Sequence, residues 1–141
     1  MPEFHDYSVF MTIGKPNSKK ELEWERKVEE IEKITDGLGY PIDKGIQHTV
    51  AAFNLSEFPT DGSCEGHPEG DHGEPFPWVD VCPEPEGLLE DEALQKKWKK
   101  ENLLLQKNIL GLLEEFYKNR QTPLELRLMP RPIGAFGAFR V

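Results

Sequence analysis

The sequence feature that most constrains the fold is an amphipathic pattern from Leu88 to about Tyr117. Its apolar side chains recur at helical spacing, at Leu94, Trp98, Leu105, Ile109, Leu112, Leu113 and Phe116. A helix of this length carries a continuous apolar stripe, and such a stripe is stable only when another layer covers it. The chain must therefore supply a second layer, and its other segments predict what that layer contains.

Two shorter helices are predicted before the long one. Ser18 and Glu21 have the spacing of a capping box, and the apolar residues that follow share one helical face, at Trp24, Val28, Ile31 and Leu38. Asp43 is expected to be the N-cap of a second helix that ends near Asn54. Both helices present an apolar face to the same core.

Short strands account for most of the remaining chain. Alternation and bounding prolines or glycines predict strands at residues 7–13, 78–82, 124–128 and 134–141, with a short strand or turn at 60–66. Residues 130–132 are expected to form a turn. The order β-α-α-β-β-α-β-β predicts an α+β, two-layer sandwich with a mostly antiparallel sheet. The 141 residues fit a single domain, 1–141, with a large functional loop at about 59–87.

The charges are distributed unevenly along the chain. Residues 45–95 contain no Lys or Arg, whereas residues 96–141 contain ten such bases and four acids. The acidic middle segment would repel a phosphate backbone and attract a cation, so nucleic acid is not an expected partner. Neither a membrane span nor a secretory signal is present in the pattern, which predicts a cytoplasmic protein with two reduced cysteines.

Cys64, His67 and His72 form the clearest candidate metal site. Thiolate and imidazole are the ligands that zinc prefers, and three protein ligands leave one coordination position open, as in catalytic sites. A closed structural site would need a fourth ligand, for which the sequence offers Asp71, Asp80, Cys82 or His48. Zinc is therefore the expected cofactor if these side chains converge.

The same residues admit a second chemistry, without a metal. Cys64 is a candidate nucleophile, with His67 or His72 as the base that generates its thiolate. Glu65 is a candidate general base, or alternatively a residue that orients one of the histidines. Both chemistries need the side chains to meet in space, which sequence alone does not establish.

A polar ligand pocket is predicted around the same turn. Gly62 and Gly66 bracket backbone amides that can converge on a ligand, and Thr60 and Ser63 add hydroxyls. Arg127 and Arg140 are candidate partners for an anion, since the guanidinium fork matches carboxylate or phosphate. Trp78 is either a stacking surface for a ligand or a core residue.

The run Ser63-Cys64-Glu65-Gly66-His67, which follows a short helix and precedes Trp78, resembles a signature of small uncharacterised microbial proteins. Residues 42–81 are also similar, remotely, to the wybutosine-synthesis tRNA methyltransferase family, in which a Thr-Ser-Ser-Cys-Ser-Gly-Arg turn follows a helix. Glu65 and His67 depart from that turn. The resemblance implies a turn shape and does not transfer methyl-transfer activity.

These observations favour a small-ligand-binding protein whose polar pocket is built on the Ser63–His72 turn, with an anionic or nucleotide-like ligand. A metal-dependent hydrolase or transferase that uses Cys64, His67 and His72 is the first alternative. A protein-interaction module without catalysis is the second. The glycine-rich terminal strand, as an exposed sheet edge, also suggests a homodimer.

Overall fold

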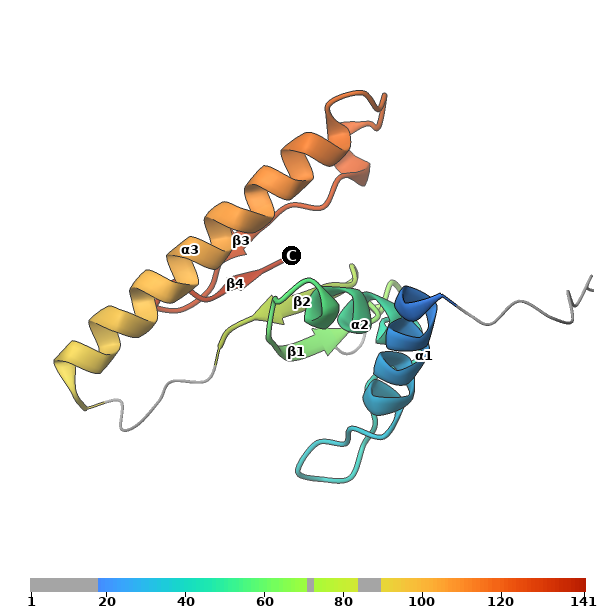
Figure 1. The fold of residues 1–141 in the computed structure, drawn as a ribbon, viewed down its shortest axis with the longest axis horizontal. Helices are drawn as coiled ribbons and strands as arrows, with labels where there is room; N and C mark the ends of the chain where they lie inside the picture. The colour runs from blue at the N-terminus through green and yellow to red at the C-terminus, as the bar shows by residue number, and fades with distance from the viewer. Residues whose placement is uncertain (1–17, 71–72, 84–89) are drawn as a thin grey trace, which may run out of the picture.

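A computed structural model describes residues 18–70, 73–83 and 90–141 of the chain (Figure 1). In these residues the elements are α1 (Lys19–Glu32), α2 (Gln47–Leu55), β1 (Thr60–Cys64), β2 (Trp78–Val81), α3 (Glu92–Tyr117), the 3-10 helix η1 (Leu124–Leu126), β3 (Arg131–Pro132) and β4 (Phe139–Arg140). The three helices and the antiparallel sheet confirm the α+β prediction. The strand predicted at residues 7–13 lies outside the described residues.

The four strands pair in the order β1-β2-β4-β3, and each neighbouring pair is antiparallel. Cys64 lies opposite Trp78, and Asp80 lies opposite Arg140. The register shifts between Thr60 and Gly62, which marks a bulge in β1. The terminal strand β4 lies inside the sheet, so the expectation that it forms an exposed edge is wrong: β1 and β3 are the edges.

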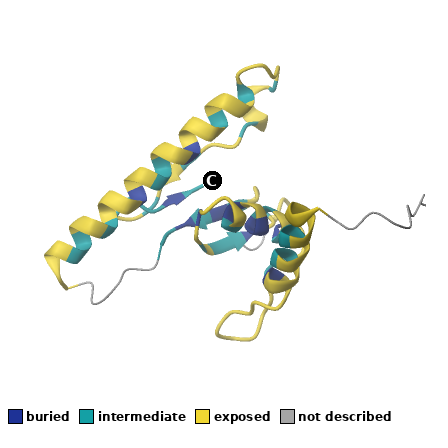
Figure 2. Cartoon of the chain, viewed as in Figure 1, coloured by how far each residue is buried: buried dark blue, intermediate teal, exposed yellow. Residues whose placement is uncertain are grey.

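The core lies where α1 and α2 pack beside the β1–β2 hairpin (Figure 2). Its fully buried side chains include Ile31, Val50, Val79, Val81 and Phe139. The long helix α3 runs beside β3 and β4 and contributes Ile109 to the same core (Figure 1). This contact covers part of the apolar stripe of α3, which the sequence predicted would need a second layer.

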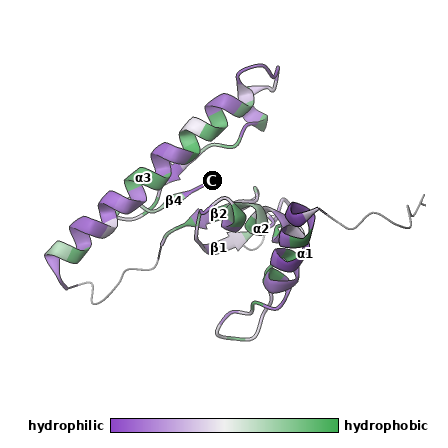
Figure 3. Ribbon diagram, in the orientation of Figure 1, coloured by the Kyte–Doolittle hydropathy of each residue, from purple (hydrophilic) through white to green (hydrophobic). Residues whose placement is uncertain are grey.

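Helix α3 is held at two further points. Asn102 is fully buried and donates from Nδ2 to the carbonyl of Phe136 at 2.9 Å. Trp98 stacks on the Phe136 ring with 5.2 Å between centroids. Apolar and polar residues alternate along this helix, whereas α1 is mostly hydrophilic (Figure 3). Within the described part of the chain, no helix is both long and apolar enough to cross a bilayer.

The start of α1 confirms the predicted capping box. The Ser18 hydroxyl accepts a hydrogen bond from the Glu21 amide, and the Glu21 carboxylate accepts one from the Ser18 amide. The prediction for Leu38 is wrong, because α1 ends at Glu32 and Leu38 is 84% exposed. Asp36 instead forms a tight turn there, since its carboxylate accepts the amides of Leu38 and Tyr40.

The predicted N-cap of the second helix is also wrong. Helix α2 begins at Gln47 with Ile46 as its N-cap, and no side chain caps it. Asp43 lies in the turn before it, and its Oδ2 accepts the amide of Glu65 at 3.1 Å. A side chain expected to make a local hydrogen bond thus bonds a residue far along the chain.

The C-terminal third departs most from the sequence prediction. The strand expected at residues 124–128 is the 3-10 helix η1, and the expected turn at 130–132 contains β3. Leu124 and Leu126 are 66% and 71% exposed, and neither belongs to a strand of the sheet. Alternation alone predicted a strand here, and in the part of the chain that the structure describes no strand pairs with this segment.

Candidate metal site and adjoining cavity

The turn that follows β1 is held in one shape by a glycine. Gly66 has a φ of 87°, and a Cβ placed on it would lie 2.8 Å from the nitrogen of Pro77. Such a contact leaves no room for a side chain, and the positive φ itself favours glycine. The amide of His67 donates to the carbonyl of Glu74 at 3.0 Å and closes the loop. The turn therefore places the His67 side chain beside the end of β1.

Three metal-ligating side chains converge at this turn: Asp43, Cys64 and His67. A carboxylate oxygen, the thiol sulfur and a ring nitrogen all lie within 4.8 Å of one another. Ligand atoms on a tetrahedral zinc lie about 3.3–3.8 Å apart, so side-chain adjustments of about 1 Å would bring these three onto one ion. Cys64 is 8% exposed, which shields its sulfur from bulk water.

Glu65 clamps the loop that carries Asp43 onto this turn. The Glu65 amide donates to Asp43 Oδ2, and Glu65 Oε2 accepts the amide of Gly45 at 2.8 Å. The amide of Gly66 also points to Cys64 Sγ at 3.4 Å, where it would stabilise a thiolate. Glu65 was predicted to act as a general base or to orient a histidine. Its contacts are those of an orienting residue, but the side chain that it holds is Asp43.

Asp43 is the candidate ligand that sequence reasoning missed. It lies more than twenty residues before Cys64, and its position before a helix indicated a cap. No local spacing relates it to the Cys64–His67 pair. The signal is a pair of hydrogen bonds between the two segments, from the Glu65 amide to Asp43 Oδ2 and from the Gly45 amide to Glu65 Oε2, which only the folded chain shows.

Among the described residues, the other candidate ligands His48 and Cys82 lie away from this cluster. His72 and Asp71 fall outside the described residues. His48 meets the edge of the Trp24 ring at 5.7 Å between centroids. Cys82 lies at the far end of the hairpin, where burial raises the pKa of its thiol and the carboxylates of Asp61 and Asp80 raise it further.

Arg140 is engaged by carboxylates. Its Nε and Nη2 donate to the two oxygens of Asp80 at 2.6 and 2.9 Å, and its Nη1 donates to Glu74 at 2.9 Å. The guanidinium lies 3.6 Å from the centre of the Trp78 ring, a cation–π contact. Hydrogen bonding to Asp80 raises the pKa of Arg140, and hydrogen bonding to Arg131 lowers the pKa of Glu74. All three guanidinium nitrogens therefore already have acidic partners.

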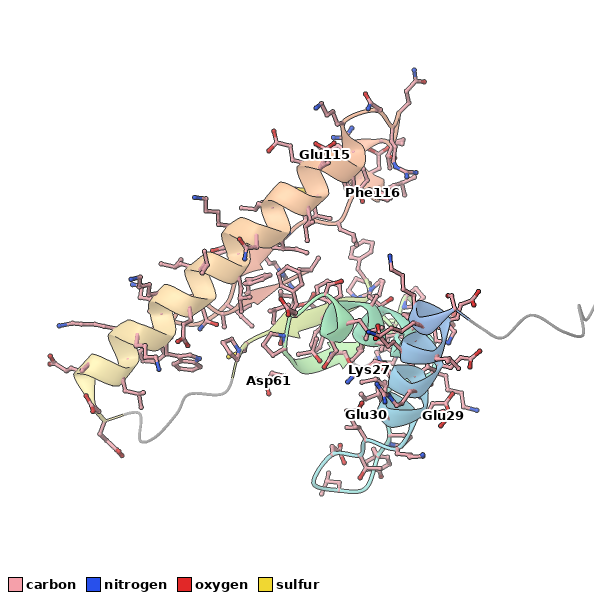
Figure 4. The ribbon with its side chains drawn as sticks, in the orientation of Figure 1. Lys27, Glu29, Glu30, Asp61, Glu115 and Phe116 are labelled. Atoms are coloured by element: carbon pink, nitrogen blue, oxygen red, sulfur yellow. The ribbon has the colours of Figure 1, made fainter. Side chains whose placement is uncertain are left out.

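Arg127 contacts its own C-terminal segment. Its Nε donates to the carbonyl of Thr122 at 2.9 Å, and its guanidinium lies 5.2 Å from the Tyr117 ring centre. Glu115 and Phe116 project near this end of α3 (Figure 4). These contacts hold the loop after α3 against the helix and do not involve the turn at Cys64.

Thr60 and Ser63 line a separate cavity of about 460 Å³, together with Asp43. Thr60 Oγ1 accepts a hydrogen bond from Asn54 Nδ2 at 2.9 Å. Ser63 and Cys64 are consecutive in β1, so their side chains point to opposite faces of the strand. The residues predicted to form one pocket are thus divided between a metal-type cluster and a cavity, and Asp43 borders both.

No protein-family model, curated protein or solved structure matches this chain.

Proposed function

We propose that the protein binds Zn²⁺ through Asp43, Cys64 and His67 and that a small ligand occupies the remaining coordination position. The observation that carries this proposal is the convergence of three side chains, of the types zinc prefers, from two separate segments. Two of the three, Cys64 and His67, were expected from sequence. Asp43 takes the place of the third ligand.

The charge of the surroundings supports a metal over a bare Cys–His pair. Residues 45–95, which include Cys64 and His67, contain twelve acids and no Lys or Arg, whereas Lys44 directly follows Asp43. A thiolate and a carboxylate would balance the charge of Zn²⁺, and the thiol proton is released on binding. No Lys or Arg is among the three converging groups, so Zn²⁺ would add a positive charge to the stabilisation that the Gly66 amide gives the Cys64 thiolate.

A metal also supplies what an anionic ligand needs. Arg140, the expected anion partner, already donates from all three guanidinium nitrogens to Asp80 and Glu74. Zinc is a Lewis acid, and its open coordination position can bind a carboxylate or phosphate oxygen or a thiolate sulfur directly. The small-ligand function is therefore proposed at the metal, in place of an arginine.

Hydrolysis or group transfer by a zinc-bound water is the second candidate, because three protein ligands leave a position open. It needs a general base, and the Glu65 carboxylate is held by the Gly45 amide. Binding is thus the simpler function for this arrangement. A cytoplasmic location, a homodimer and a protein-interaction role stay predictions.

The test is the zinc content of protein purified without a His-tag and dialysed against zinc-buffered medium. We expect about one ion per chain in the native protein and less than about 0.2 in Cys64→Ser and His67→Ala, since a filled site needs all its ligands. Cys82→Ser and His48→Ala are matched controls that should retain the ion. Equal zinc content in all five proteins would refute the site.

A further inference from the structure

We infer that the cavity beside Asp43 is a second binding site, specific for small organic ammonium ions. It has a volume of about 460 Å³ and lies between the end of α1, the following loop and β1. Pockets for small molecules typically measure about 300–1,000 Å³. Ile31 and Val50, each 2% exposed, form part of its apolar wall. A ligand there can bury a hydrocarbon portion.

The charges at the wall of this cavity have one sign. Asp36, Asp43 and Asp61 line it, and no Lys, Arg or His does so among the described residues. Asp36 Oδ1 accepts the amides of Leu38 and Tyr40, which holds this carboxylate at the turn beside the cavity. A cation is therefore attracted, whereas a carboxylate or phosphate would be repelled.

The uncharged groups at the wall also suit an ammonium ion. Asn54 uses its amide nitrogen for the Val50 carbonyl and Thr60 Oγ1, which leaves its side-chain oxygen as an acceptor. The Ser63 hydroxyl and the Asp61 carboxylate add further acceptors. Tyr40 also lines the cavity, and aromatic rings attract cations through their faces. Hydrogen-bond acceptors, an aromatic ring and an apolar wall together match an alkylammonium.

This site differs from the proposed zinc site. Ser63 faces the cavity and Cys64 faces the cluster from the opposite side of β1, and only Asp43 borders both. The cavity does not require the metal. When Zn²⁺ neutralises Asp43, however, the cavity retains the charges of Asp36 and Asp61 only. Zinc binding should consequently weaken ammonium binding, and the converse follows by linkage.

The test uses three ligands of nearly equal shape and different charge: cyclohexylammonium, cyclohexanol and cyclohexanecarboxylate. Each is titrated into the full-length, zinc-free protein and followed by amide chemical shifts in two-dimensional NMR. We expect saturable shifts at residues 40–43 and 60–63 with the ammonium ion, and binding at least about tenfold tighter than for the alcohol. The carboxylate should cause no saturable shifts there. Equal affinities for all three, or shifts confined to other regions, would overturn the proposal.

A variant that removes one charge from the cavity wall gives a second test of the ammonium site. Asp61→Asn should weaken cyclohexylammonium binding by about fivefold or more, because it removes one of the three carboxylates at the wall. Asp61 is exposed, so the fold should tolerate this change. Glu69→Gln is the control, because it removes one charge from an exposed residue that does not line the cavity. Equal losses in both variants would show general electrostatic attraction and refute a cavity site. Failure of the zinc site alone would leave these results unchanged.

Discussion

The clamp between Glu65 and the Asp43 loop gives the sharpest test of how the proposed zinc site is assembled. Glu65→Ala removes the carboxylate that accepts the Gly45 amide but leaves its own backbone amide, which bonds Asp43 Oδ2. The residue is exposed, so loss of this one hydrogen bond should lower the free energy of unfolding by only about 0.5–1.5 kcal/mol. Asp43 would be held less firmly.

The effect on zinc should be larger than the effect on stability. Residues that orient metal ligands typically change metal affinity by about 10–100-fold when removed, which corresponds to about 1.4–2.7 kcal/mol. The assay is competition for zinc with a chromophoric chelator, alongside thermal unfolding of the zinc-free protein. Glu69→Ala, an exposed acidic residue four positions later, is the control and should retain full affinity. Unchanged zinc affinity in Glu65→Ala, with loss in Cys64→Ser, would refute the clamp.

Three further predictions concern the turn, the ion-pair cluster and the second cysteine. Gly66→Ala should destabilise the protein by about 2–5 kcal/mol in chemical unfolding, whereas Gly70→Ala, also at positive φ but with nothing within 4 Å of its Cβ, should cost less than half as much. The pKa of Glu74 is lowered from 4.5 mainly by hydrogen bonding to Arg131, so its stabilising contribution is present above pH 4.5 and is lost as the pH falls through the lower folded value. The thermal midpoint of the native protein should therefore fall more steeply below pH 4.5 than that of Glu74→Gln, and parallel curves would contradict this. Burial raises the pKa of Cys82 above 9.0, so less of its thiol is ionised at pH 8. In a Cys64→Ser background, iodoacetamide should therefore react with Cys82 more slowly than with free cysteine. An equal rate would contradict the raised pKa.

Local signals in the sequence predicted the parts of the fold that depend on neighbouring residues. Ser18 and Glu21 form the expected cap, and the prolines around residues 78–82 bound a strand as expected. The α3 pattern predicted a helix, although its N-cap, Asp91, lies after the expected start. Each of these features follows from side chains within one turn or one strand.

Features that depend on distant contacts were not predictable in the same way. Asp43 was expected to cap a helix, but the Glu65 amide competes for its carboxylate from across the fold. Arg140 was expected to face an anionic ligand, yet the register of β2 and β4 places it opposite Asp80. Leu124 and Leu126 alternate as a strand would, but no strand of the described residues pairs with them. In each case a tertiary contact decides between options that the sequence leaves equivalent.

The most direct test of the proposed zinc site is X-ray absorption at the zinc edge of untagged protein loaded with one equivalent of metal. Coordination by Asp43, Cys64 and His67 predicts one sulfur at about 2.3 Å and nitrogen or oxygen neighbours at about 2.0–2.2 Å. Cys64→Ser should remove the sulfur contribution, and Cys82→Ser should leave it unchanged. A zinc shell without sulfur in the native protein would contradict the account.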